Sequence, residues 1–312
     1  MKSKNIILVT GGAGNIGSGL INKLSINKSN TIICIDNLTT GSLNKINKSK
    51  NILFKKIDVN KLSQISNVFN NYKIDFVFHF AALVGVKRTL ENPLKVFNDI
   101  KGIKNILELS KSNNVKKVFF SSSSEVYGEP FEIPQNEETT PLNARLPYAI
   151  VKNLGESYFR AYFQLYGLNY TIFRFFNTYG PNQSTDFVIS KFISLALNNK
   201  DITVYGDGLQ TRTFCFIDDN VDTMINILSQ NICNQEVINI GSDYEIPIID
   251  LAKIIIDLLK SKSKIIHLPP LKEGDMKRRK PDITKMKNII KRELVDLEDG
   301  IKITAKHLKI NE

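Results

Sequence analysis

Short apolar runs, separated by polar and helical stretches, dominate the first half of the chain. Five runs of strand type are predicted, at residues 6–9, 31–35, 52–56, 76–80 and 118–121. Between them the pattern predicts helices, at residues 16–24, 61–71 and 93–112. Strands that are apolar almost throughout are typical of parallel sheets covered by helices on both faces. We therefore expect an α/β fold with a doubly wound parallel sheet.

Glycines at three-residue spacing follow the first predicted strand. Gly11, Gly14 and Gly17 lie where that strand gives way to the first predicted helix. Glycine permits a tight turn and lets the backbone approach a pyrophosphate, and the helix N-terminus offers free N–H groups to the phosphates. A glycine triplet alone also fits an ordinary flexible loop. The flanking strand and helix favour a dinucleotide site.

A carboxylate ends the second predicted strand. Asp36 follows the apolar residues 31–35. Such a carboxylate accepts hydrogen bonds from a ribose diol and repels a 2′-phosphate, so the sequence favours NAD over NADP. Asp58 and Val59 lie at the next strand end, where adenine is commonly bound, although Val59 fits simple core packing almost as well.

Tyr148 and Lys152 stand one helical turn apart in the segment YAIVK, so they share one face of a predicted helix at residues 148–166. A phenol in a free peptide has a pKa near about 10. A cation about 4 Å away, at an effective dielectric of about 20, stabilises the phenolate by roughly 4 kcal/mol, or about three pKa units. The pair therefore predicts a tyrosine general base. The alternative is an ordinary surface pair on an amphipathic helix.

Four serines, at residues 121–124, directly follow the fifth predicted strand and lead into Glu125. Ligands of open α/β sheets bind at the carboxyl ends of the strands. A hydroxyl at this place can hold a substrate alcohol, although four serines also fit a polar turn. With Tyr148 downstream, we favour a functional role.

These motifs resemble the extended short-chain dehydrogenase/reductase family, and within it the NAD-dependent nucleotide-sugar epimerases and dehydratases. The chain looks like the UDP-glucose 4-epimerases, with further motifs similar to those of UDP-glucuronate decarboxylases. The similar segments span almost the whole chain and are TGGAGNIGS (10–18), HFAA (79–82), SSSSEVYGEP (121–130), YAIVK (148–152), RFFNTYGP (174–181), VYGDGLQTRTF (204–214) and RRKPDITK (278–285).

The resemblance implies a role for each matching residue. Tyr148 would be the catalytic base, Lys152 would orient the ribose and lower the tyrosine pKa, and Ser123 would hold the reacting hydroxyl, with Glu125 as a further catalytic candidate. The implied NAD-binding residues are Gly11, Gly14, Asn15, Ile16, Gly17, Asp36, Asn37, Asp58, Val59, Ala81, Ala82, Tyr148 and Lys152. The implied substrate-binding residues are Ser123, Ser124, Asn177, Tyr205, Arg212 and Lys272. Among the latter, Asn177 and Arg212 would contact the diphosphate, with Lys272 as a weaker contact. Asp99 departs from the family pattern, which usually has asparagine there.

The resemblance implies that bound NAD first oxidises the C4 hydroxyl of a UDP-sugar. We expect a 4-epimerase that works through a transient 4-keto intermediate, because residues 83–86 (Leu-Val-Gly-Val) offer no polar group to hold a carboxylate. UDP-glucuronate decarboxylase is the second reading, since the pair Ser124-Glu125 and the segment RRKPDI are similar to that subfamily. An NDP-sugar 4,6-dehydratase is third, because it has Asp-Glu where this chain has Ser-Glu. A non-catalytic NAD-binding regulatory protein is less favoured, since such relatives usually lose the tyrosine or the lysine.

The length of 312 residues suits two domains. We expect an NAD-binding Rossmann domain at residues 1–180, with a return segment at about 214–241 that carries short strands at 214–217 and 237–240. A smaller C-terminal α/β domain at residues 181–312 would bind the nucleotide sugar.

The formal charge is +11, from 42 Lys and Arg against 31 Asp and Glu. The lysines are scattered among asparagines and isoleucines without interleaved aromatic residues, so we expect no nucleic-acid partner. The three cysteines lack metal-ligand spacing, which predicts reduced thiols and no metal site. We read His79 as structural rather than as a ligand. The apolar runs are too short for a signal peptide or a membrane span, so we expect a cytoplasmic protein without a membrane partner.

The helix at residues 148–166 carries more aromatic side chains than one core-facing stripe requires. The resemblance implies a homodimer, formed through this helix and the preceding long one. The alternative is that these aromatic side chains pack inside the monomer.

Overall fold

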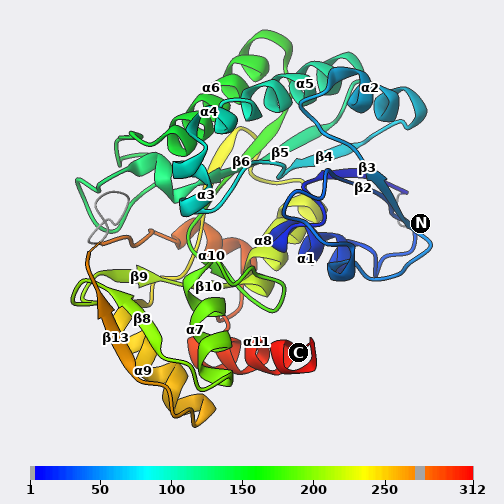
Figure 1. Cartoon of the computed structure of the whole chain (residues 1–312). Coiled ribbons are helices and arrows are strands. Elements are labelled where there is room, and N and C mark those ends of the chain that lie inside the picture. Colours follow the sequence, from blue (N-terminus) through cyan, green and yellow to red (C-terminus); the bar gives the residue numbers. More distant parts are fainter. Residues whose placement is uncertain (1–3, 271–277, 312) are drawn as a thin grey trace. The chain divides into compact units, whose positions relative to one another are not determined.

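The computed structural model describes residues 4–270 and 278–311 and divides into two compact units (Figure 1). Unit 1 comprises Met1–Val126, Ala144–Phe175 and Val221–Ile238. Unit 2 comprises Tyr127–Asn143, Phe176–Asn220 and Asn239–Glu312. We predicted that one domain binds NAD and the other binds the nucleotide sugar. This assignment of ligands to the domains remains a prediction.

A seven-stranded sheet, in the order β11-β6-β5-β4-β1-β2-β3, organises unit 1. Its strands are β1 (Ile6–Thr10), β2 (Thr31–Asp36), β3 (Ile52–Lys56), β4 (Phe76–His79), β5 (Lys117–Ser123), β6 (Tyr170–Phe175) and β11 (Glu236–Ile240). The pairs from β3 through to β6 are all parallel. Strands β2 and β3 lie on one side of β1 in the sheet. Strands β4, β5, β6 and β11 lie on its other side. The carboxyl ends of β1 and β4 therefore flank the point where the strand order reverses, which is where open α/β sheets bind ligands.

The central strands are buried on both faces. Every residue of β5 is buried, as are the last four of β1 and the last five of β2. Helices cover the two faces of this sheet, with α2, α5 and α6 on one side and α1 and α8 on the other (Figure 1). The predicted doubly wound parallel sheet is confirmed.

The helices of unit 1 follow the apolar periodicity of the sequence. They are α1 (Asn15–Leu24), α2 (Leu62–Asn71), α3 (Val86–Glu91), α4 (Pro93–Val96), α5 (Asp99–Ser112), α6 (Pro147–Tyr166) and most of α8 (Ile217–Gln230), with 3₁₀ turns η1 (Leu43–Lys45) and η2 (Ser124–Tyr127). Pro147 occupies the first turn of α6, where its missing N–H costs nothing, and Gly167 ends that helix in a left-handed conformation.

Three predicted elements need correction. The helix expected at residues 93–112 is divided, because Asn98 N donates to Lys95 O at 3.1 Å and Lys101 N donates to Asn98 O at 3.0 Å, which are three-residue turns. The fifth strand runs on to Ser123, so most of the serine run lies inside the sheet, where the ladder with β6 continues. The strand expected at residues 214–217 is only β10 (Cys215–Phe216), because Ile217 already begins α8.

Unit 2 combines small sheets with helices. Its strands are β7 (Thr178–Tyr179), β8 (Ile202–Tyr205), β9 (Thr211–Thr213), β10, β12 (Glu245–Pro247) and β13 (Ile265–Leu268). Its helices are α7 (Val188–Leu197), α9 (Ile248–Leu259), α10 (Thr284–Ile290) and α11 (Leu297–Asn311). β9 pairs antiparallel with β12, whereas β8–β13 and β7–β10 are parallel pairs. Helices α7, α9 and α11 pack together, with Ile193, Leu251 and Ile301 buried in the core of this unit.

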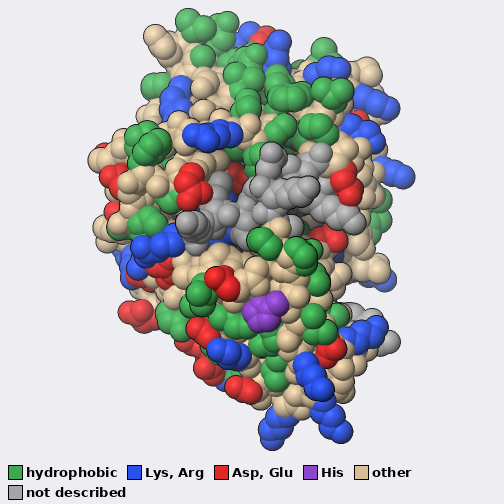
Figure 2. All heavy atoms as spheres, turned by 60° about the vertical axis from the view of Figure 1, so that its left-hand side comes forward, with side chains coloured by type: hydrophobic (Ala, Val, Ile, Leu, Met, Phe, Trp, Pro, Cys, Tyr) green, Lys and Arg blue, Asp and Glu red, His purple; other side chains and the backbone are tan. Residues whose placement is uncertain are grey.

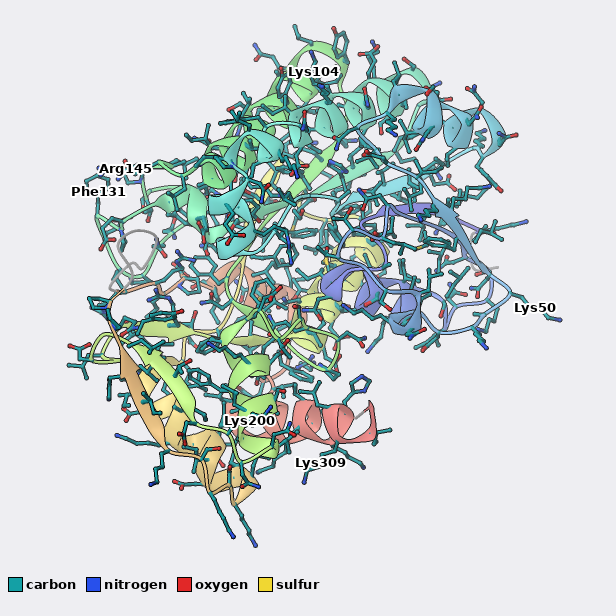
Figure 3. All side chains as sticks on the ribbon, viewed as in Figure 1. Lys50, Lys104, Phe131, Arg145, Lys200 and Lys309 are labelled. Atoms are coloured by element: carbon teal, nitrogen blue, oxygen red, sulfur yellow. The ribbon has the colours of Figure 1, made fainter. Side chains whose placement is uncertain are left out.

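Basic side chains are spread over separate surface elements. Lys50 and Lys104 in unit 1, and Lys200 and Lys309 in unit 2, are all exposed (Figure 3). The three cysteines are free thiols, and Cys34 and Cys215 are buried. Across the described residues, no helix is both long and apolar enough to cross a membrane. The same residues contain no group of three His, Cys, Asp or Glu side chains placed to hold a metal ion.

Candidate active site

The turn between β1 and α1 has room only for glycine at two positions. Gly11 has a φ of +66°, and a Cβ there would lie 2.7 Å from the main-chain nitrogen of Ala81. A Cβ on Gly17 would lie 2.3 Å from the carbonyl oxygen of Gly11, so α1 packs directly on this turn. The two glycines therefore allow this turn to pack closely against the backbone after β4 and against α1, as the tight turn of a dinucleotide site requires.

The first residue of α1 also fits a ligand at this turn. The Oδ1 atom of Asn15 is buried and has no hydrogen-bond partner among the described residues. A buried amide oxygen without a donor is costly. A bound dinucleotide that donates a hydroxyl here would remove that cost. Ile16, which follows in α1, is half-buried.

Asp36 lies at the end of β2 and faces the same turn. Its Oδ2 accepts a hydrogen bond from Ala13 N at 3.0 Å, and its Oδ1 accepts one from Leu38 N at 2.8 Å. These bonds fix the orientation of the carboxylate, which has about four lone-pair sites and can still accept from a ribose diol. Asn37 is exposed, and its Oδ1 accepts from Thr39 N at 3.0 Å. The structure thus brings Asp36 and the glycine turn together.

Two other predicted cofactor positions follow β3 and β4. Asp58 Oδ1 accepts from Asn60 N at 3.0 Å. The side chain of Val59 is 5% exposed and belongs to the core of unit 1, as the alternative prediction of core packing expected. A role of Val59 in binding adenine stays a prediction. Ala81, next to Gly11, donates from its main-chain nitrogen to Thr10 Oγ1 at 3.3 Å. Ala82 follows it and is half-buried.

Lys152 lies between the end of β5 and Tyr148. Its Nζ donates to the carbonyl oxygen of Ser121 at 2.6 Å and to Ser121 Oγ at 3.3 Å. The same nitrogen lies 5.6 Å from the ring centroid of Tyr148 and 5.0 Å from that of Phe120. The Lys152 side chain is buried, whereas Tyr148 is only partly buried. The predicted tyrosine–lysine pair is thus held against the strand that carries the serines.

Burial controls the charge of Lys152. It lowers the pKa of Lys152 to about 8, and the nearby Asp99 carboxylate opposes this by raising it. Burial, with the charge of Lys152, lowers the pKa of His79 to about 3. His79 is therefore neutral, and its Nδ1 hydrogen-bonds with Thr10 Oγ1 at 2.8 Å, which agrees with a structural role.

Asp99, which the sequence left without a role, interacts electrostatically with this lysine. Its Oδ2 accepts a hydrogen bond from Leu83 N at 2.7 Å, so it also holds the loop after β4. Burial raises the pKa of Asp99, while the Leu83 hydrogen bond and the charge of Lys152 lower it. No local sequence signal predicts this contact, because Asp99 begins α5 and Lys152 lies in α6.

Ser123, Ser124 and Glu125 stand where β5 turns into η2. Ser123 Oγ accepts a hydrogen bond from Glu125 N at 3.2 Å, which leaves its hydroxyl proton free to be donated. Both serines are buried, and Glu125 is half-buried. The structure therefore places these three residues at the same sheet edge as Lys152.

The predicted substrate residues of the second half belong to unit 2. Asn177 Nδ2 donates to Thr213 O at 3.0 Å, and Arg212 lies beside Thr213 in β9 with its NH1 donating to Thr211 O at 2.8 Å. Asn177 and Arg212 are thus brought together. Tyr205 ends β8 and is 38% exposed. Lys272 lies outside the described residues.

Glu156 is a further buried residue near this site that none of the sequence motifs includes. This carboxylate is completely buried and lies one helical turn beyond Lys152 on the same face of α6. Its four-residue spacing from Lys152 is the sequence signal that predicts a common helix face for the two residues.

Comparisons with known proteins identify the family of the chain. Residues 7–241 match the model of the NAD dependent epimerase/dehydratase family. The chain is 36% identical, over 311 residues, to a putative UDP-glucose 4-epimerase from Methanocaldococcus jannaschii, with 98% of this chain and 99% of that protein covered. It is 37% identical, over 323 residues, to a UDP-N-acetyl-alpha-D-glucosaminuronate decarboxylase from Bacillus cytotoxicus, with 96% and 97% covered. Its fold is similar to the crystal structure of UDP-glucose 4-epimerase from Thermotoga maritima with UDP-glucose, with a TM-score of 0.92, 32% identity, and 98% of this chain and 99% of that one covered.

Proposed function

We propose that this chain, which belongs to the NAD-dependent epimerase/dehydratase family, is a 4-epimerase that acts on a UDP-sugar through a transient 4-keto intermediate. One observation carries the proposal most directly. Lys152 is buried, bonded to Ser121 at the end of β5, and 5.6 Å from the ring of Tyr148. That arrangement suits the removal of a proton from a sugar alcohol at a site built for NAD.

The chain's own residues supply the binding and the proton transfer. The backbone at Gly11, Gly14 and Gly17 would hold the pyrophosphate of NAD, and Asp36 would hold its adenosine ribose. NAD, when bound, accepts a hydride from the sugar carbon. Tyr148 would take the hydroxyl proton of that carbon, and the charge of Lys152 would stabilise the phenolate.

The substrate needs to be held at the alcohol and at the diphosphate. We assign Ser123 to the reacting hydroxyl, because its Oγ accepts from Glu125 N and so keeps its proton for donation. We assign Asn177 and Arg212 to the diphosphate, because a guanidinium matches phosphate oxygens. After oxidation the 4-keto sugar would turn over and take the hydride back on its other face, which inverts C4.

The loop after β4 supports a neutral sugar as the first choice. Leu83 packs against the apolar core of unit 1, and no ionisable side chain lies within residues 83–86. An apolar wall suits a neutral pyranose ring better than a carboxylate.

Decarboxylation of a UDP-uronate is the second candidate, and two observations favour it. Glu125 lies beside Ser123, where it could handle a second proton. The guanidinium of Arg88 also reaches the loop after β4, since its NH1 donates to Val84 O at 2.6 Å. In this second reading we assign the Arg88 cation to the carboxylate of the sugar. Dehydration is the third candidate.

We further propose a homodimer and a cytoplasmic location. Apolar side chains gather over α4 and α6 of unit 1 on the face that Figure 2 presents. On α6 the exposed members follow a helical repeat, with Ile150 at 41%, Leu154 at 39% and Leu165 at 69% exposed. Leu94 in α4 is 81% exposed. A second copy of the chain would cover such a face. The free thiols support a reducing compartment.

A labelled substrate tests the C4 hydride mechanism. UDP-glucose deuterated at C4 should be converted into a product that retains the deuterium at C4, with a slower rate than the unlabelled sugar. Nuclear magnetic resonance would follow the label. Complete loss of the label to solvent would contradict the mechanism.

A further inference from the structure

We propose that Glu156 is a positioning residue for the Tyr148–Lys152 pair: it fixes α6 to β5 and β6 so that the base stays aligned with Ser123. This inference rests on the proposed function of that pair. Glu156 itself is completely buried and touches neither substrate nor cofactor in this assignment.

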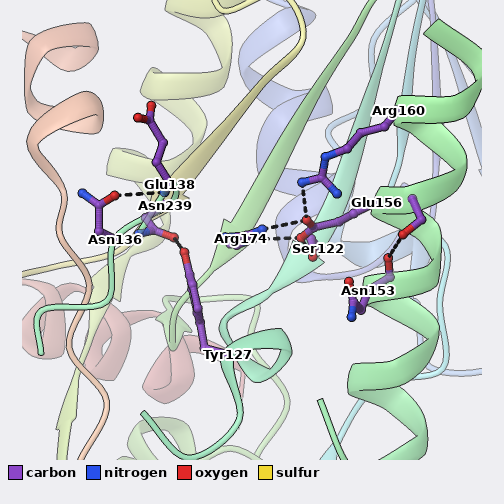
Figure 4. Close-up of polar contacts among 10 residues, drawn as sticks. Ser122, Tyr127, Asn136, Glu138, Asn153, Glu156, Arg160, Arg174 and Asn239 are labelled. Atoms are coloured by element: carbon purple, nitrogen blue, oxygen red, sulfur yellow. Dashed lines mark hydrogen bonds and ion pairs between the residues drawn. The ribbon is translucent and has the colours of Figure 1, made fainter. Parts of the chain in front are cut away.

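Four hydrogen bonds converge on the Glu156 carboxylate (Figure 4). Its Oε1 accepts from Ser122 Oγ at 2.6 Å and from Arg174 Nε at 2.9 Å. Its Oε2 accepts from Arg174 NH2 at 2.8 Å and from Arg160 NH2 at 3.0 Å. Ser122 belongs to β5, Arg174 to β6, and Arg160 to α6 itself. The carboxylate therefore joins one helix to two neighbouring strands.

The cluster keeps its charge although it is buried. Burial alone would raise the pKa of Glu156, but the hydrogen bonds and charge of Arg174, the Ser122 hydroxyl and Arg160 outweigh it and hold the pKa below its usual value. The fork of Arg174 binds both carboxylate oxygens, which fixes direction as well as distance. Buried ion pairs often add little stability over apolar packing. Fixed geometry is the property that this cluster supplies.

The attachment lies directly beside the proposed chemistry. Lys152 and Glu156 are one turn apart on α6, and they bind the consecutive residues Ser121 and Ser122 of β5. The next strand residue is Ser123. In the β5–β6 ladder Ser122 pairs with Arg174, so the second attachment is itself braced by the sheet. Two contacts at successive turns prevent α6 from sliding or rotating about either one.

Such alignment matters because proton transfer depends steeply on geometry. A misplacement of about 1 Å costs on the order of 10²-fold in rate. Loss of the Ser122 bond would remove the hydrogen bond between Glu156 and β5 and leave Glu156 paired with both arginines. Tyr148 would then spend less time in line with an alcohol held by Ser123.

Removal of the carboxylate is a poor test, because Glu156→Gln leaves the buried guanidinium of Arg174 opposite a neutral amide and endangers folding. Ser122→Ala and Arg160→Ala form a matched pair instead, since each deletes one donor to the same carboxylate. Of these two donors, only Ser122 belongs to the sheet. Arg160 comes from α6 itself, and its side chain is 44% exposed.

The readout is kcat and KM for the UDP-sugar that the unmodified protein turns over, normalised to the concentration of NAD-binding sites. Ser122→Ala should lower kcat by about 10-fold or more. Its KM and its Kd for NAD should change by less than about 2-fold, and Arg160→Ala should stay within about 2-fold of the unmodified protein throughout. Equal kcat values for the two variants would overturn the proposal, and so would a loss confined to KM or to NAD affinity.

Hydrogen exchange separates this inference from the proposed function. Should the unmodified protein turn over no UDP-sugar, the proposed function fails, but amide exchange still reports the attachment. Amides of Lys117–Ser123 and of the first turns of α6 should then exchange faster in Ser122→Ala than in Arg160→Ala. Equal exchange in the two variants would overturn the positioning role.

Discussion

Lys152 of α6 donates from Nζ to the main-chain carbonyl oxygen of Ser121 in β5 at 2.6 Å. This bond ties the residue one turn after Tyr148 to the strand that ends in Ser123. A buried ammonium needs such acceptors, because an unpaired buried charge is costly. The bond thus satisfies the lysine and holds the helix of the predicted base against the strand that ends in Ser123.

The first prediction concerns Tyr148. Tyr148→Phe should fold and bind NAD with nearly unchanged affinity, because only a hydroxyl on a partly buried ring is lost. Turnover should fall by about 10²–10⁴-fold, the usual contribution of general acid–base catalysis. Steady-state kinetics and NAD titration measure the two effects. Tyr158→Phe on the same helix is the control and should keep normal turnover. Near-normal turnover of Tyr148→Phe would exclude Tyr148 as the base.

The second prediction concerns cofactor choice. The unmodified protein should bind NAD much more tightly than NADP, because the Asp36 carboxylate repels a 2′-phosphate. Asp36→Ala should narrow that difference, and it should weaken NAD binding by roughly 10-fold or more through the lost hydrogen bonds to a charged acceptor. Calorimetric titration with both cofactors measures this.

Asp36→Asn is the matched control for the second prediction. It keeps an oxygen that can accept from Ala13 N or Leu38 N, and it removes the negative charge. It should narrow the difference in affinity between NAD and NADP, while loosening the turn less than Asp36→Ala does. Equal or tighter binding of NADP by the unmodified protein would defeat the role of Asp36.

The third prediction concerns pH. Burial lowers the pKa of Lys152 to about 8, and the proposed role needs the protonated ammonium, which exists below that pKa. The value of kcat/KM should therefore fall as the pH rises through about 8. Asp99→Asn removes the charge that raises the pKa of Lys152, so the alkaline fall should move to lower pH. A pH–rate profile of both proteins measures the shift.

Glu108→Gln controls for the loss of one negative charge from α5. Glu108 lies on the same helix as Asp99, with its side chain 51% exposed, so its loss should leave the alkaline fall in place. The coupling of Asp99 to Lys152 would be refuted in either of two cases. The pH at which kcat/KM falls could stay unchanged in Asp99→Asn, or it could shift equally in both variants.

The fourth prediction separates the reactions through Glu125. A 4-epimerase needs Tyr148, the hydride and room for the keto sugar to turn, so Glu125→Gln should retain a large share of activity. A decarboxylase or dehydratase would use this carboxylate in its second proton step and should lose about 10²-fold or more. The measurement is kcat of both proteins on the same UDP-sugar. A severe loss would favour the lyase readings over epimerisation.

The sheet and the cofactor turn were predictable because their signals are local. The strands are apolar runs at residues 6–9 and 31–35, and Gly11 and Gly17 sit where a side chain would collide with backbone. Tyr148 and Lys152 share a helix, so their common face follows from their spacing alone.

Contacts between distant elements were not predictable in the same way. Asp99 begins α5, and only the packing of α5 beside α6 brings it toward Lys152. Arg174 meets Glu156 because β6 pairs with β5, a register that neither residue encodes locally. The extension of β5 through Ser123 has the same cause, since the ladder with β6 continues where the sequence turns polar.

Product analysis tests the central claim most directly. The purified protein, supplied with NAD, would be incubated separately with UDP-glucose, UDP-N-acetylglucosamine, UDP-glucuronate and UDP-N-acetylglucosaminuronate, and the products would be identified by mass spectrometry and nuclear magnetic resonance. We predict a product of unchanged mass with inverted C4 from one of the two neutral sugars. The assignment as a 4-epimerase would be contradicted if none of the four sugars is inverted at C4 and a uronate loses carbon dioxide or a neutral sugar loses water.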